Sequence, residues 1–411
     1  MTFAEERGHA ADEGALMPTD ICVVGGCGHV GLPLSIAFAL RGKRVAILDT
    51  DEVAIAKIAS GQMPFIEEDG PESLRSALAS GNLTIADGPQ AISETAAVVL
   101  VVGTPIDGHL SPSFHAIDAV LEQYKPYFRA GQTIVLRSTL YPGTTQRVYR
   151  WIQAAGLDVH VATCPERIAQ GFAMRELCTL PQIVSSCSPE GLEAAKALFS
   201  TLADDIIVLE PMEAELAKLY NNAWRYIKFA AANQFYMIAN ECGVDYDRVH
   251  YGVTYKYPRG SDLPKPGLSS GPCLFKDTMQ LSAFADNHFF IGHSAMLVNE
   301  GLPNYLVRRM RDKWDLGNMT VGILGMSFKA DIDDVRDSLS FKLRDILETE
   351  SKAVVCSDPY FSGPGIFSTE EAIEKSDLLI IAIPHSGYAS ISTDGKPFVD
   401  IWNVLGKGRG V

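Results

Sequence analysis

Short apolar runs alternate with helical stretches along the first half of the chain. Ile21 to Val24 is a β-branched run that predicts a strand, Leu32 to Leu40 predicts a helix, and Arg44 to Leu48 predicts a second strand. Further strands are predicted at Ala97 to Val102, Thr133 to Leu136, Val159 to Ala162 and Ile183 to Ser185. Strands that alternate with helices indicate a parallel sheet covered on both faces.

The pattern changes between Met212 and Cys242. Apolar residues recur there at steps of three and four, at Leu216, Leu219, Ala223, Ile227, Ala231, Phe235, Ile238 and Cys242. This spacing predicts one long amphipathic helix, whose length suits a connection between domains or a dimer contact. The segment from Tyr257 to Pro272 is rich in Pro and Gly and predicts a loop.

The last third of the chain returns to the α/β pattern. Strands are predicted at Thr320 to Leu324, Ala353 to Cys356 and Leu378 to Ile383, with a helix at Ser338 to Leu347. The run that begins at Asp377 is similar to the run that begins at Ala97, which indicates a weak internal repeat. We therefore expect an α/β fold in which two Rossmann-like, doubly wound parallel-sheet domains are joined by a long central helix. The expected divisions are a flexible tail over 1–19, a first Rossmann domain over 20–208, a central helical domain with a cysteine loop over 209–316, and a C-terminal Rossmann-like domain over 317–411.

Composition and charge argue against several classes of function and partner. The 411 residues are 47% apolar and 21% charged, as in ordinary globular proteins. The 35 basic and 50 acidic residues give a net charge of −15, which argues against nucleic acid and anionic membranes as partners. No apolar run is long enough to span a bilayer, and the acidic first twenty residues lack the features of a secretory signal. With eight cysteines and no CxxC pair, we expect a cytoplasmic protein with reduced thiols and no metal site.

A glycine cluster between the first strand and the first helix predicts a dinucleotide site. In the G-x-G-x-x-G pattern the first glycine makes the tight turn, the second admits a pyrophosphate, and the third lets the helix pack on the strand. Asp49 follows Gly31 by 18 residues, where a carboxylate can bind ribose hydroxyls, and no neighbouring arginine could accept a 2′-phosphate. This favours NAD over NADP; the alternative is a tight turn that binds nothing. The expected cofactor contacts are Gly26, Gly28, His29, Val30, Gly31 and Asp49.

The C-terminal half has an incomplete dinucleotide pattern, with only Gly322 and Gly325 near its first strand. Lys329 and Arg336 follow, so a second nucleotide-type ligand held by basic side chains fits this half better than a second NAD. The alternative is that these two cations are surface charges, which balance nearby aspartates.

Taken in order, these motifs resemble the UDP-glucose/GDP-mannose dehydrogenase family of nucleotide-sugar 6-dehydrogenases. The similarity runs from about Ile21 to Asn403. It includes GGCGHVGLPLS from Gly25, LDTDE from Leu48, VGTP from Val102, VLRSTLYPGTT from Val135, CPER from Cys164, EAELAKLYNNAWR from Glu213, GPCLFKD from Gly271 and GILGMSFKADIDDVRDS from Gly322. The resemblance implies that a sugar CH2OH is oxidised to a carboxylate, that two NAD are reduced and that the aldehyde is not released. The product would be a uronate for polysaccharide or glycan precursors.

The resemblance implies catalytic roles for five residues. Cys273 occupies the position of the nucleophile, which traps the aldehyde as a thiohemiacetal and then forms a thioester. Lys218 matches the electrostatic catalyst, and Asn222, four residues later on the same helix face, matches its hydrogen-bonding partner. The Lys218 ammonium is also expected to lower the pKa of the thiol. Glu166 matches the base for thioester hydrolysis, and Asp277 matches the aspartate that orders water. Taken singly, these residues could equally be a buried thiol, a solvated lysine and surface acids.

The remaining contacts also follow from the resemblance. Lys329 and Arg259 resemble substrate contacts, and Arg336 resembles a contact near NAD. Thr104 and Thr139 end strands at the carboxyl edge of the sheet and resemble cofactor contacts. Lys276 is a further expected cofactor contact, and the further expected substrate contacts are Glu166, Arg167, Lys218, Asn222, Gly271 and Phe328.

Two departures from the family pattern concern the substrate. The loop Ser269-Ser270-Gly271-Pro272 has serines where the family often has glycines, and Pro272 removes a backbone donor beside Cys273. Pro-Glu-Arg replaces the Pro-Glu-Phe of the UDP-glucose branch, and so resembles the branch that acts on UDP-N-acetylhexosamines.

Two other functions are compatible with parts of the sequence. A β-hydroxyacid-type dehydrogenase makes one hydride transfer and needs neither Cys273 nor a second nucleotide-like half. A non-catalytic nucleotide-sugar sensor is expected to have lost Cys273 or Lys218, and both are present. The resemblance and the long helix together predict at least a homodimer, packed through Met212 to Cys242.

Overall fold

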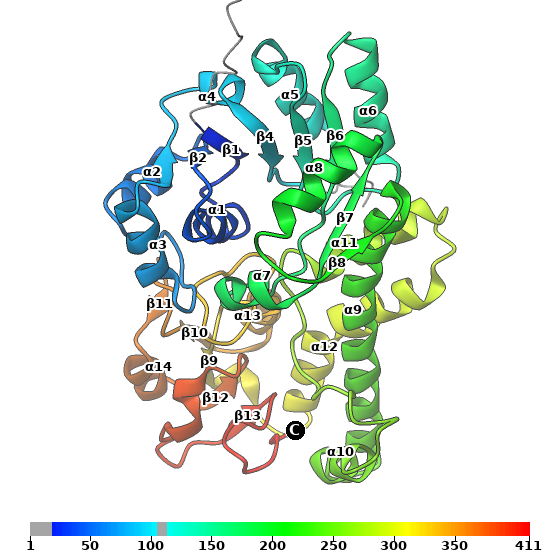
Figure 1. Ribbon diagram of the computed structural model, residues 1–411. Helices are drawn as coiled ribbons and strands as arrows, with labels where there is room; N and C mark the ends of the chain where they lie inside the picture. Colours follow the sequence, from blue (N-terminus) through cyan, green and yellow to red (C-terminus); the bar gives the residue numbers. More distant parts are fainter. Residues whose placement is uncertain (1–18, 105–112) are drawn as a thin grey trace, which may run out of the picture.

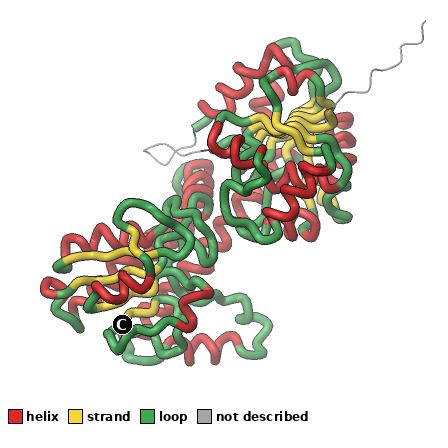
Figure 2. Tube along the Cα trace, turned by 90° about the vertical axis from the view of Figure 1, so that its left-hand side faces the viewer, coloured by secondary structure: helices red, strands yellow, loops and turns green. Residues whose placement is uncertain are grey.

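The protein consists of two sheet-containing lobes joined by helices (Figures 1 and 2). The computed structural model describes residues 19–104 and 113–411. The tail expected over 1–19 therefore lies outside the described residues, apart from Thr19, which begins the first strand. No helix in the described ranges is long and apolar enough to cross a bilayer.

The first lobe is built on an eight-stranded sheet with the order β3-β2-β1-β4-β5-β6-β7-β8. Its strands are β1 (Thr19–Val24), β2 (Val45–Leu48), β3 (Leu83–Ile85), β4 (Thr95–Leu100), β5 (Thr133–Leu136), β6 (His160–Thr163), β7 (Gln182–Ser186) and β8 (Ile206–Val208). Strands β1 to β6 are parallel, as expected. The difference from the expectation is that β7 pairs antiparallel to β6. Strand β6 ends at the carboxyl edge of the parallel strands, and β7 begins at the same edge. The chain therefore runs through β7 in the opposite direction.

Both faces of this sheet are buried, which explains its continuous apolar runs. Ile21 and Val23 of β1 point into one apolar cluster, and Cys22 and Val24 point into another. The covering helices are α1 (Gly31–Leu40), α2 (Glu52–Ala59), α3 (Gly70–Ala79), α4 (Gln90–Ser93), α5 (His115–Tyr124), α6 (Thr144–Ala154), α7 (Ala173–Thr179) and α8 (Pro189–Phe199).

A single helix of 31 residues, α9 (Pro211–Glu241), runs from the first lobe along the second (Figure 1). It begins with a capping box between Glu210 and Glu213. The helix agrees with the prediction, but its buried face does not. Lys218 and Asn222 are buried, whereas Phe235 and Ile238 of the predicted apolar series are about half exposed, at 51% and 49%.

The second lobe contains a five-stranded, fully parallel sheet with the order β11-β10-β9-β12-β13. Its strands are β9 (Thr320–Leu324), β10 (Ala353–Ser357), β11 (Ile366–Phe367), β12 (Leu378–Ile381) and β13 (Phe398–Asp400). The remaining helices are α10 (Tyr246–Thr254), α11 (Leu274–Phe284), α12 (Phe290–Arg311), α13 (Leu339–Glu350) and α14 (Thr369–Lys375). Of these, α11 packs against α9 and α12, and its Lys276 contacts Thr104 of the first lobe. The predicted loop over Tyr257 to Pro272 contains no helix or strand.

Candidate active site

The glycine-rich turn after β1 is tightly packed at its start. Gly25 has φ of 76°, and a Cβ there would lie 1.9 Å from the carbonyl oxygen of Val101. The left-handed turn therefore lies at Gly25, one residue before the glycine expected to make it. A Cβ on Gly26 would lie 2.8 Å from Cγ2 of Ile47, so this glycine lets β2 approach the turn.

The rest of the turn fits a dinucleotide. A Cβ on Gly31 would lie 2.2 Å from the oxygen of Gly25, so this glycine brings the start of α1 against the turn. A Cβ on Gly28, by contrast, would have no atom nearer than 4.0 Å, apart from those of its chain neighbours. Protein packing therefore leaves this side of the backbone open to a ligand. Asp49 accepts a hydrogen bond from the amide of Cys27 at 2.8 Å, which holds its carboxylate at the turn. Pyrophosphate beside Gly28 and ribose hydroxyls at Asp49 would suit this arrangement.

Other predicted cofactor contacts lie around this turn and at the carboxyl edge of the sheet. The ring of His29 stacks on Phe65 with centroids 4.1 Å apart, and burial lowers the pKa of His29. Thr104 donates a hydrogen bond to the carbonyl of Thr139 at 2.7 Å, and Lys276 donates to Thr104 at 3.3 Å. The structure therefore brings Thr104, Thr139 and Lys276 together. Val30 is the N-cap residue of α1.

Cys273 lies near enough to a buried lysine for their charges to affect one another. Cys273 is exposed and caps the start of α11, whereas the side chain of Lys218 on α9 is only 8% exposed. Burial lowers the pKa of Lys218, and the nearby charges of Asp277, Cys273 and Glu166 oppose this shift. Among the described residues, no hydrogen bond or ion pair engages the Lys218 ammonium. A buried cation without a partner is costly to folding, and such groups are typical of functional sites.

The surroundings of Cys273 raise the pKa of its thiol rather than lower it. Removal of the thiol from bulk water is the largest cause, and the charge of Asp277 adds to it. Lys218 and Lys276 lower this pKa, as expected for Lys218, but their effect is smaller. The expected effect of Lys218 is therefore present, but desolvation and the charge of Asp277 outweigh it, so the pKa of the thiol is raised overall.

A chain of polar contacts connects α9 to α11. The amide of Asn222 donates to the carboxylate of Asp277, which is fully buried and also pairs with Lys276 at 2.7 Å. Arg225 donates to the amide oxygen of Asn222 at 2.9 Å. Arg225 was not predicted as a site residue, although it ends the motif that contains Lys218 and Asn222. Its charge also acts on Cys273.

Glu166 is held firmly in place. Its carboxylate pairs with Arg137 and accepts hydrogen bonds from the amides of Arg167 at 2.6 Å and Ile168 at 3.0 Å. Arg137 is fully buried and also donates to the carbonyl of Cys164 at 2.7 Å. A carboxylate offers about four acceptor positions, so one remains for water or substrate. Arg137 was missed, although a charge directly after the apolar run of β5 was a visible signal.

The second lobe contributes the opposite side of the site. A Cβ on Gly271 would lie 2.5 Å from the ring of Phe328, so this glycine lets the cysteine loop pack on the second lobe. Ser270, one of the two serines by which the loop departs from the family pattern, accepts a hydrogen bond from the amide of Leu339 at 3.2 Å, at the start of α13. Lys329 donates to the carbonyl of Gln170 in the first lobe at 2.8 Å.

The side chains of three predicted residues make their hydrogen bonds and ion pairs outside this cluster of contacts. Arg336 pairs with Asp334 at 2.6 Å, although its charge reaches His29 of the glycine turn. Arg167 donates its guanidinium to the carbonyl of Pro181. Arg259 is exposed and donates to the hydroxyl of Tyr257 at 3.0 Å. Within the described residues, no hydrogen bond or ion pair connects Arg259 to another predicted site residue.

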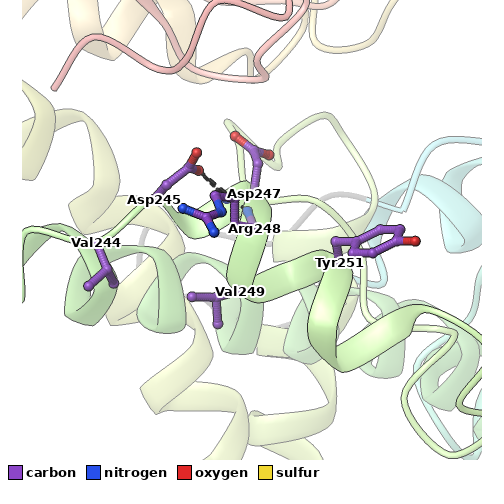
Figure 3. Close-up of a pocket in the computed structure, with 6 residues that line it drawn as sticks. All are labelled: Val244, Asp245, Asp247, Arg248, Val249 and Tyr251. Atoms are coloured by element: carbon purple, nitrogen blue, oxygen red, sulfur yellow. Dashed lines mark hydrogen bonds between the residues drawn. The ribbon is translucent and has the colours of Figure 1, made fainter.

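A separate cavity of about 650 Å³ lies at the corner between α9 and α10 (Figure 3). Its lining residues are Val244, Asp245, Asp247, Arg248, Val249 and Tyr251. Asp245 accepts hydrogen bonds from the amides of Asp247 at 2.9 Å and Arg248 at 3.4 Å, and so caps α10. None of the predicted site residues lines this cavity. Across residues 19–104 and 113–411, no group of three or more His, Cys, Asp or Glu side chains could hold a metal ion.

Comparison with protein families accounts for nearly the whole chain. Residues 19–203 match the NAD binding domain of the UDP-glucose/GDP-mannose dehydrogenase family, residues 212–300 match its central domain, and residues 322–407 match its UDP binding domain. The chain belongs to the UDP-glucose/GDP-mannose dehydrogenase family. It is therefore an NAD-dependent oxidoreductase of the nucleotide-sugar dehydrogenases, and the resemblance seen in the sequence is confirmed.

Relatives within the family are named for different substrates. A UDP-N-acetyl-D-mannosamine dehydrogenase of Methanococcus vannielii is 30% identical over 94% of this chain and 93% of its own length. The structure of a UDP-glucose dehydrogenase from Pyrobaculum islandicum has a TM-score of 0.88, 27% identity and 96% coverage of both chains. The structure of a UDP-D-ManNAc dehydrogenase from Pyrococcus horikoshii has a TM-score of 0.87 and 26% identity, and covers 94% of this chain and 96% of that one. The fold thus agrees equally well with dehydrogenases of an acetamido sugar and of glucose.

Proposed function

We propose that this member of the family oxidises the C6 alcohol of a UDP-sugar to a carboxylate in two successive two-electron steps. The observation that carries the proposal is that Cys273 lies near the buried ammonium of Lys218, which has no hydrogen-bond or ion-pair partner among the described residues. NAD, held at Gly28 and Asp49, supplies the hydride acceptor for each step.

Lys218 acts first, as the cation that stabilises negative charge on the C6 oxygen while the hydroxyl proton passes to water and the hydride leaves C6. Its ammonium has no competing partner among the described residues, so its donors are free for a substrate oxygen. A preformed charge in a desolvated site stabilises a developing oxyanion without reorganisation.

Cys273 then holds the C6 carbon. Its sulfur adds to the aldehyde carbon to give a thiohemiacetal, which becomes a thioester when the second hydride leaves C6. Because the pKa of the thiol is raised, its proton leaves as the sulfur attacks, and the former aldehyde oxygen gains a proton to become the hydroxyl of the thiohemiacetal. The covalent bond keeps the aldehyde from escaping between the two oxidations.

Glu166 and Asp277 complete the reaction by hydrolysis of the thioester. Glu166 accepts the proton of an attacking water through its remaining acceptor position, and the sulfur of Cys273 leaves. Asp277, fixed by Asn222 and Lys276, orders water near the sulfur. The products are the uronate and the free thiol.

For the substrate we propose a UDP-hexose with an acetamido group at C2, and UDP-glucose as the second candidate. The Pro-Glu-Arg sequence around Glu166 and the names of several relatives support the acetamido sugar. The structural similarity to a UDP-glucose dehydrogenase favours the second candidate. Lys329, Phe328 and Gly271 are the proposed contacts of the nucleotide-sugar, with Arg259 as a further cation.

We further propose domain divisions at 20–208, 209–316 and 317–411, a cytoplasmic location, and a homodimer packed through α9. Large apolar side chains on α9 are exposed, among them Trp224 at 56% and Phe235 at 51%. Exposed apolar patches of this kind are typical of protein interfaces.

The test is to incubate the purified protein with NAD and UDP-N-acetylmannosamine, UDP-glucose or GDP-mannose, and to follow NADH at 340 nm. Two NADH per molecule of uronate are expected with a UDP-sugar. One NADH per substrate would instead support a β-hydroxyacid-type reaction, and no NADH with any sugar nucleotide would refute the proposal and favour a sensor.

A further inference from the structure

A buried carboxylate outside the catalytic set, Glu67, fixes a turn at the carboxyl edge of the first sheet. Glu67 lies in the connection between α2 and α3, and its side chain is 4% exposed. One of its oxygens accepts the amide of Gly171 at 3.0 Å, and the other accepts the amide of Ala173 at 2.5 Å. The two oxygens of one carboxylate thus satisfy two amides of the turn 170–173 and hold them at a fixed separation.

This turn is also the partner of Lys329 from the second lobe. Lys329 donates to the carbonyl of Gln170 at 2.8 Å, and its ammonium lies 4.5 Å from the ring centroid of Phe172. Burial raises the pKa of Glu67, whereas the backbone hydrogen bonds and the charge of Lys329 oppose this shift. The carboxylate, the turn and the lysine therefore form one connected unit, which crosses from one lobe to the other.

We propose that Glu67 is a positioning residue of the nucleotide-sugar site, which acts through the turn 170–173 on Lys329 and hence on the diphosphate of the ligand. This inference rests on the proposed function of Lys329. Without both acceptor oxygens, one amide of the turn is left buried and unsatisfied, and the turn relaxes. Lys329 then loses the fixed partners, the carbonyl of Gln170 and the ring of Phe172, that hold its ammonium in place.

The neighbours of Glu67 separate this role from NAD binding. Phe65 stacks on His29 of the glycine turn, and the amide of Ile66 donates to the carboxylate of Asp333 at 3.2 Å. Neither contact uses the carboxylate of Glu67. A substitution confined to that carboxylate should therefore disturb the turn 170–173 and leave the glycine turn intact.

The test is calorimetric binding of UDP and of NAD to the full-length protein. Glu67→Gln keeps the size of the side chain but replaces one acceptor oxygen by a donor. Glu72→Gln, at an exposed position of α3, is the matched control. We expect Glu67→Gln to bind UDP about tenfold more weakly and NAD within about twofold of wild type. With a UDP-sugar substrate, KM should rise about tenfold, with kcat changed less than about twofold.

Several results would overturn the inference. Equal UDP affinity of Glu67→Gln and wild type would do so, and so would a parallel loss of UDP and NAD binding, which indicates a general structural role. If Glu67→Gln does not fold, Glu67→Asp is measured in the same way. It retains both oxygens on a shorter side chain and should bind UDP with reduced affinity, so wild-type affinity would count against the inference. Failure of the wild-type protein to bind UDP would refute the proposed function itself, which distinguishes the two cases.

Discussion

Asn222 donates its side-chain amide to the carboxylate of Asp277, and this bond joins α9 to α11 one helical turn after Cys273. Because Arg225 occupies the amide oxygen of Asn222, the orientation of the amide is set from both sides. In the structure Asn222 is therefore a hydrogen-bonding partner of Asp277, whereas the resemblance implied that it is the partner of Lys218. One N–H of its amide is left for the substrate.

Replacement of the proposed nucleophile should separate binding from turnover. In Cys273→Ala we expect NAD affinity within about twofold of wild type and a loss of NADH production of at least about a thousandfold, because no covalent intermediate can form. Calorimetry and the 340 nm assay measure the two effects. Cys187→Ala is the matched control, since burial raises the pKa of Cys187 to about 11 and makes it unreactive. Comparable turnover of both variants would remove Cys273 from its assigned role.

The reactivity of Cys273 should respond to pH in a direction set by its neighbours. Since protein surroundings and Asp277 raise its pKa, alkylation by iodoacetamide should be slow at pH 7 and accelerate as the pH rises above the ordinary range of a thiol. Asp277→Asn should shift the midpoint to lower pH, and Lys218→Met should shift it to higher pH. Mass spectrometry of the peptide that contains Cys273 gives the rates. Shifts in the opposite directions would contradict the electrostatic description.

The buried ammonium of Lys218 should lower the free energy of unfolding of the protein. Burial lowers its pKa below 10.5, so between the folded and unfolded pKa values the unfolded chain binds more protons. Wild-type stability therefore gains as pH rises through that interval. We expect Lys218→Met to be more stable by about 1 kcal/mol or more at pH 7, and this advantage should shrink as the pH approaches 10.5. Urea denaturation across this range checks it, and a constant or growing advantage would refute it.

Glu166→Gln should arrest the reaction after the second oxidation. The amide cannot accept a proton from water, so a thioester on Cys273 should accumulate and be detected by intact-protein mass spectrometry as a covalent adduct. The same change leaves Arg137 buried without its counter-charge, at a cost of about 3 kcal/mol. Glu176→Gln, a glutamate of α7 that is not among the predicted catalytic residues, is the comparison for stability and for adduct formation. Full turnover of Glu166→Gln without adduct would exclude Glu166 as the base.

The exposed apolar side chains of α9 should control the oligomeric state. Trp224→Glu places a charge at a side chain that is 56% exposed, and it should convert a dimer to monomers in light scattering. Val53→Glu, on α2 at a side chain that is 69% exposed, should leave the dimer intact. A wild-type monomer at micromolar concentration would contradict the predicted dimer.

The sequence was informative where structure depends on neighbours along the chain. The alternation of apolar runs located β1, β4 and β5, and the glycine pattern located the turn before α1. It failed where distant segments decide the outcome. The buried face of α9 is set by contacts such as Asn222 with Asp277, and the partner of Glu166 is an arginine 29 residues earlier. The reversal of β7 depends on the connection at the sheet edge, which no local pattern encodes.

The packing of Gly271 on Phe328 limits which C-terminal parts can be exchanged between members of the family. The loop of the nucleophile is closed by an aromatic ring encoded more than fifty residues downstream. A chimaera that exchanges the C-terminal third with that of a relative must therefore bring a side chain that fits the same glycine. Mismatched parts would each fold and still leave Gly271, two residues before Cys273, without the ring on which it packs.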